Sequence, residues 1–227
     1  GSRPYAWRRL SMSDEQVCKM VALFRLELKN LRLNFWVPII ICYILIPCVM
    51  LSEAIMCGGF ENAEMNIRLS FQRYMSPMGC WWILFVLRSF IDEEGYELLH
   101  VPNFRWNTLY MRTICFASLY ILQSIPLFVI STLFLPSFHS FFIGISIQVI
   151  WFAAAAYFMA IVTKNTLIPL MVITLIEIFS FIFPGTIISP IDSSGLYFPN
   201  ALLKLAFLFV SSVILFIAGR FIEKSKP

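Results

Sequence analysis

Six continuous apolar runs, separated by shorter polar stretches, dominate the sequence. Each run approaches the ~20 residues that an α-helix needs to cross a bilayer. Strands of a membrane barrel would instead alternate apolar and polar residues over about ten residues. Pro77 falls in the first turn of the second run, where a helix tolerates proline. The pattern predicts an all-α, polytopic membrane protein with six transmembrane helices, over residues 35–51, 74–90, 113–135, 138–163, 166–183 and 202–222.

The stretch before the first run has a different, amphipathic pattern. Residues 17–33 carry apolar side chains at helical spacing with basic side chains between them, which is typical of a helix lying in the headgroup layer. A second interpretation is that this helix also supports a soluble partner. We expect residues 3–33 to form a cytoplasmic N-terminus that precedes a single membrane domain, 34–227. The residues that carry the pattern are Met20, Phe24, Leu28 and Leu31, with Lys19, Arg25, Lys29 and Arg32.

Two connections between the predicted spans are unusual. Residues 92–112 begin with an acidic, helix-compatible turn, which Pro102 ends. Residues 184–200 are rich in Pro, Gly and Ser, yet they include Ile187, Ile188 and Tyr197. Because a loop this apolar is unsuited to water, we expect it to enter the outer leaflet as a re-entrant segment, with its backbone groups satisfied by protein or water.

Composition and charge support a membrane location and set an orientation. The chain is 59% hydrophobic and 13% charged, whereas soluble domains are about 45–50% apolar and about 25% charged. With both termini in the cytoplasm, all but three of the 17 Lys and Arg residues fall inside, as the positive-inside rule requires. The three that fall outside are Arg68, Arg73 and Lys204.

Catalytic and metal-binding signatures are missing from the sequence. It contains no HExxH, no GxSxG and no phosphate-binding loop. His100 and His139 fall on opposite sides of the predicted membrane, and the six cysteines show no paired spacing. We therefore expect the chain not to be an enzyme, to hold no cofactor or metal, and to bind no nucleic acid.

The arrangement resembles the permease subunit of type-two ABC exporters. The family carries an acidic motif, Glu-x-Gly-Thr-x-Glu-x-Leu followed by Pro, after its second span. Tyr96 stands here where Thr is commoner, and Arg112 matches an Arg near the third span. The resemblance implies docking on a separate ATP-binding cassette subunit, which would hold ATP and magnesium. The residues implied to contact that subunit are Glu93, Glu94, Gly95, Glu97, Leu98 and Leu99, before Pro102.

The resemblance also implies a second permease subunit, identical or related, and a substrate path where the second and fifth spans meet. Glu177 is the one charged residue near mid-membrane in the predicted spans, and a charge at that depth is costly. It either faces the path or makes an interhelical hydrogen bond. The aromatic residues line the path or face lipid. The candidate path residues are Glu177, Thr174, Ser180, Trp81, Trp82 and Phe85.

The function implied is the export of a hydrophobic or amphipathic substrate, namely a peptide, lipid or drug, across a bacterial cell membrane. The alternative is a membrane sensor or immunity protein that acts through a partner. A membrane enzyme is the third possibility, and the missing catalytic motifs disfavour it.

Overall fold

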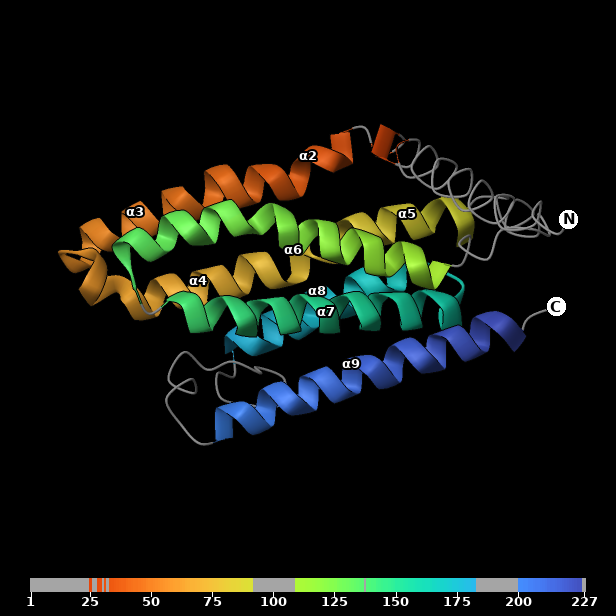
Figure 1. Cartoon of the computed structure of the whole chain (residues 1–227). Helices are drawn as coiled ribbons and strands as arrows, with labels where there is room; N and C mark the ends of the chain where they lie inside the picture. Colours follow the sequence, from red (N-terminus) through yellow and green to blue (C-terminus); the bar gives the residue numbers. More distant parts are fainter. Residues whose placement is uncertain are drawn as a thin grey trace, which may run out of the picture.

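The computed structural model describes residues 25, 28–29, 31, 33–91, 109–136, 138–182 and 200–225. These residues are almost all helical and include no strand, which confirms the all-α prediction. The helices lie lengthwise beside one another and alternate in direction (Figure 1). We call the end of the bundle where Leu33 and Ser225 lie the proximal end, and the end where Cys57 lies the distal end.

The first crossing of the bundle is one continuous helical stretch with a π-helical turn in it. It comprises α2 (Leu33–Ile40), η1 (Ile41–Leu45) and α3 (Ile46–Cys57), and it extends beyond the predicted run at both ends. In the π-turn the N–H of Ile46 donates to the carbonyl of Ile41. Pro47 follows at once and has no N–H to give, so the proline accounts for the local change in winding. The stretch ends at Gly58, which adopts the left-handed conformation with φ 75°.

The second crossing differs from the prediction. Helix α4 (Phe60–Met78) begins just after a two-glycine turn, well before residue 74, and α5 (Trp81–Ile91) continues it toward the proximal end (Figure 1). Arg68 and Arg73 therefore belong to a helix of the bundle and not to an external connection. Pro77 lies in the last turn of α4, so its expected place in the first turn of a span is wrong. Because α4 has a polar composition, a search for apolar runs does not detect it.

The remaining helices follow the predicted runs within a few residues. They are α6 (Leu109–Phe134), α7 (Phe138–Thr163), α8 (Leu167–Ile182) and α9 (Asn200–Ser225). Four helical stretches are long and apolar enough to cross a membrane, namely Leu33–Cys57, Leu109–Phe134, Phe141–Thr163 and Leu203–Lys224. Leu167–Phe179 of α8 is a shorter apolar helix. These stretches indicate a membrane-embedded protein.

The predicted amphipathic helix 17–33 and the predicted re-entrant segment 184–200 lie almost entirely outside the described residues. Of the former, Arg25, Leu28, Lys29 and Leu31 are described and helical. Leu31 is buried, and Leu28 packs against the core.

Helix α7 lies at the centre of the bundle and packs most extensively against α9. Small residues make this close approach possible, as is common between membrane helices. Ala153, Ala154 and Ala160 of α7 are buried in the same cluster as Phe216 of α9. On α9, a Cβ atom added at Gly219 would lie 2.5 Å from Cε1 of Tyr157. Gly219 is therefore required for the two helices to approach this closely.

Substituting Gly219 by alanine is expected to destabilise the protein. Overpacking costs about 1–3 kcal/mol, and the better helix propensity of alanine returns only about 1 kcal/mol. The measurement is the thermal unfolding midpoint in detergent. Val213→Ile adds one methylene to an exposed position of the same helix and serves as the control. Equal unfolding midpoints for the two variants would show that the ring of Tyr157 can move aside without a loss of stability.

Candidate functional site

Glu177 of α8 has a cationic neighbour in the structure. Its side chain is half-buried, and Arg73 of α4 lies close enough for a favourable charge interaction. Cys80, at the break between α4 and α5, is also in electrostatic reach of Glu177. Hydropathy alone does not pair these charges, because it places Arg73 in an external connection. Once α4 is a helix packed against α8, the two side chains can compensate each other inside the bundle.

Of Thr174 and Ser180, the two hydroxyl residues predicted to line the path with Glu177, only Thr174 has a described side chain. Thr174 is exposed, and its Oγ1 donates to the carbonyl of Leu170 at 2.8 Å, so its hydrogen is used on its own helix. The side chain of Ser180 lies outside the described residues. Among the described residues, Arg73 contributes a favourable charge interaction to Glu177 from another helix.

The three predicted aromatic path residues lie on two faces of α5, with Trp82 on one and Trp81 and Phe85 on the other. Trp82 is buried and stacks on Phe35 with centroids 5.2 Å apart, and its Nε1 donates to the carbonyl of Phe35 at 3.1 Å. Trp81 instead packs against Phe85 at 5.1 Å, and both are half-buried. Successive helical residues point about 100° apart, so the two tryptophans cannot line one wall. Trp82 belongs to the core of the subunit.

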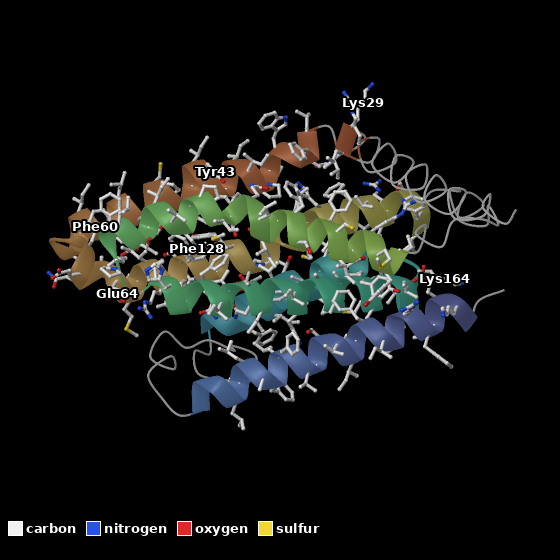
Figure 2. All side chains as sticks on the ribbon, in the orientation of Figure 1. Lys29, Tyr43, Phe60, Glu64, Phe128 and Lys164 are labelled. Carbon is white, nitrogen blue, oxygen red and sulfur yellow. The ribbon has the colours of Figure 1, made fainter. Side chains whose placement is uncertain are left out.

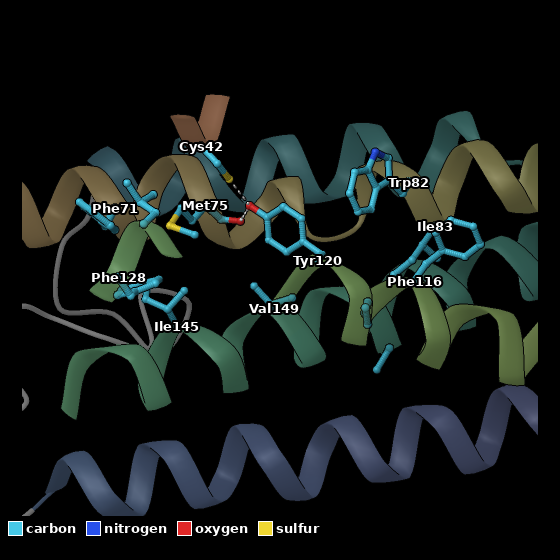
Figure 3. Packing of buried hydrophobic residues seen from close by; sticks show 14 of the residues in the cluster. Cys42, Phe71, Met75, Trp82, Ile83, Phe116, Tyr120, Phe128, Ile145 and Val149 are labelled. Carbon is cyan, nitrogen blue, oxygen red and sulfur yellow. Dashed lines mark hydrogen bonds between the residues drawn. The ribbon is translucent and has the colours of Figure 1, made fainter. Parts of the chain in front are cut away.

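The interior next to Trp82 contains a small hydrogen-bonded group that joins three helices (Figure 3). The hydroxyl of Tyr120 on α6 donates to the carbonyl of Met75 on α4 at 2.9 Å. The sulfur of Cys42, in the π-turn, lies 3.6 Å from the same hydroxyl. The π-turn therefore places Cys42 where it contacts a buried polar group.

A row of buried polar residues follows α4 along its contact with α7. Arg68, Gln72 and Ser76 recur every four residues, which puts them on one helical face. Arg68 pairs with Glu64 and lies over the rings of Phe138 and Phe141 at 5.8 and 5.7 Å. Ser76 donates to Oε1 of Gln148 on α7 at 2.8 Å. The spacing of four could have revealed this face from the sequence.

This polar row explains how a polar helix fits inside an apolar bundle. In a medium that offers no water, buried polar groups must find partners within the protein. Oε1 of Gln72 has no hydrogen-bond partner in the part of the chain that the structure describes. Glu64 lies toward the distal end and Lys164 at the opposite end of the bundle (Figure 2).

The residues predicted to contact an ATPase, Glu93, Glu94, Gly95, Glu97, Leu98 and Leu99, lie outside the described residues. The described residues that flank them, Ile91 and Leu109, are both at the proximal end. Helix α5 therefore ends, and α6 begins, at the end of the bundle where α2 begins.

A metal centre finds no support in the described residues, where no three His, Cys, Asp or Glu side chains form a group that could hold an ion. No disulfide joins the described cysteines, which are Cys42, Cys48, Cys57, Cys80 and Cys115. No known protein-family model, curated protein or solved structure matches the chain.

Proposed function

We propose that the chain is the membrane subunit of an ATP-driven exporter of the type-two ABC class. The substrate would be hydrophobic or amphipathic, such as a peptide, a lipid or a drug. Two copies of the chain, or one copy and a related permease, would form the translocation unit. ATP and magnesium would bind to separate cassette subunits at the cytoplasmic side of a bacterial cell membrane.

The observation that carries the proposal is the placement of the acidic segment. Residues 92–108, which contain Glu93, Glu94, Gly95 and Glu97, are bounded at both sides by helix ends at the proximal end. The basic residue Lys29 lies just before α2 at the same end (Figure 2). An acidic segment and a basic helix on one side of the membrane would together offer a charged surface to a soluble partner, and complementary charges favour such docking.

The charge distribution of the described helices supports a cytoplasmic proximal end. Lys164 follows α7 there, and Arg220 and Lys224 lie in the last turns of α9. Lys204 lies in the first turns of α9, toward the distal end. Basic residues concentrate on the cytoplasmic side of membrane proteins.

ATP hydrolysis by the purified complex tests the proposed function. The chain carries no nucleotide-binding motif, so ATPase activity that co-elutes with it must come from a partner. We expect vanadate-sensitive hydrolysis in material purified from native membranes through a tag on this chain. A tagged, unrelated membrane protein from the same membranes is the control. Purified chain without ATPase activity, or a partner of the sensor type, would favour the alternative function.

Thiol labelling tests the orientation. Cys57 ends α3 at the distal end and is half-buried, with Nδ2 of Asn66 at 3.8 Å from its sulfur. With both termini cytoplasmic, a membrane-impermeant maleimide applied to intact cells should label Cys57 and leave Cys18 unlabelled. Labelling of Cys18 in place of Cys57 would reverse the orientation.

A further inference from the structure

Glu223, near the end of α9, joins three helices at the proximal end. Its Oε1 accepts a hydrogen bond from the backbone N–H of Leu109, the first residue of α6, at 2.9 Å. Its Oε2 accepts a hydrogen bond from the hydroxyl of Tyr157 on α7 at 2.6 Å. Both carboxylate oxygens are thus used, each on a different helix.

The negative charge of Glu223 suits its position at the beginning of α6. The first N–H groups of a helix have no partner within that helix, and they form the positive end of the helix dipole. A carboxylate that accepts one of them is a charge-assisted hydrogen bond, stronger than a neutral one. Glu223 therefore stabilises the start of α6 from another part of the chain.

Neighbouring residues of α9 extend the same contact. Phe216, Gly219, Arg220 and Glu223 share one helical face. The ring of Tyr110 on α6 packs against Phe216 with centroids 5.6 Å apart, and Arg220 lies over that ring at 5.3 Å. This proximal cluster fixes the beginning of α6 to the paired helices α7 and α9.

The position of Leu109 gives the cluster a possible role in transport. Leu109 is the first described residue after residues 92–108, the segment with the proposed docking residues. We propose that Glu223 is a positioning residue for coupling. It fixes the exit of that segment to α7 and α9, so that a displacement imposed on the segment moves α6, α7 and α9 together. This inference rests on the proposed function.

Replacing Glu223 by alanine removes both hydrogen bonds and tests the role. The readout is the rate at which maleimide labels Cys57, at the opposite end of the bundle, with and without ATP and vanadate. We expect the unmodified complex to show a nucleotide-dependent rate. In Glu223→Ala that difference should fall at least about fivefold, the lower end of typical couplings between sites, while ATP hydrolysis continues.

Three further variants separate positioning from mere stability. In Glu223→Gln the amide can accept from Leu109 and donate to the Tyr157 oxygen, so coupling should be retained. Lys224 is the exposed neighbour of Glu223, and Lys224→Ala should leave the nucleotide-dependent labelling difference unchanged. If Glu223→Ala does not assemble, Tyr157→Phe removes only one hydrogen bond and should reduce the nucleotide-dependent difference.

The outcomes are distinct. An unchanged nucleotide-dependent difference in Glu223→Ala, or in Tyr157→Phe where the first variant does not assemble, would overturn the inference. So would an active unmodified complex whose labelling does not respond to nucleotide. If the unmodified chain purifies without an ATPase, the proposed function itself fails.

Discussion

Replacing Glu177 by leucine is expected to lower the stability of the bundle, because Arg73 then loses a favourable charge interaction between α4 and α8. Removing one partner of a fully buried pair costs about 3–5 kcal/mol. Glu177 and Arg73 are each half-buried, so the cost is smaller. The measurement is unfolding of the purified chain in detergent, followed through loss of helical structure.

The double variant Arg73→Leu/Glu177→Leu provides the matched control. Replacing both members of a pair by apolar residues is often neutral, so the double variant should recover most of the loss. A double variant whose loss equals the sum of the two single losses would show that the charges do not interact. Glu177 would then remain available to face a translocation path, which is one of the two alternatives that the sequence leaves open.

Reversing the charges of Glu94 and Glu97 to lysine should reduce recovery of the ATPase subunit at least tenfold. Truncating or misplacing a charge at an interface costs about 2–5 kcal/mol, and about 1.4 kcal/mol is a tenfold change in affinity. Recovery is quantified as the molar ratio of partner to tagged chain after purification.

Glu61→Lys is the control for that charge reversal. Glu61 is exposed in the first turn of α4, at the distal end, and its reversal changes the net charge in the same direction. Recovery of the partner should be unchanged in this variant. Equal loss in both variants would mean that net charge, and not the acidic segment, controls assembly.

Helices α6, α7 and α9 could be predicted from the sequence because each is a continuous apolar stretch. Helix α4 could not be found in this way, since its interior face carries Arg68, Gln72 and Ser76. The free-energy cost of burying these side chains is offset by partners elsewhere: Glu64 pairs with Arg68, and Gln148 accepts a hydrogen bond from Ser76. A hydropathy profile cannot detect hydrogen-bond or ion-pair partners that come together only in the folded chain.

The same limit applies to the candidate site. The separation of Trp81 from Trp82 follows from helix geometry and was available from the sequence. The approach of Arg73 to Glu177 was not, because it depends on α4 lying beside α8. The contacts of Glu223 join residues more than sixty positions apart in the chain, and no local pattern marks them.

Native mass spectrometry of the detergent-solubilised particle tests the central claim most directly. The proposal predicts a particle with two permease subunits and two ATP-binding subunits, in which this chain supplies one or both permeases. Addition of ATP and vanadate should leave nucleotide bound to the partner subunits. A particle that contains this chain alone, or this chain with a partner that binds no nucleotide, would contradict the assignment as an exporter subunit.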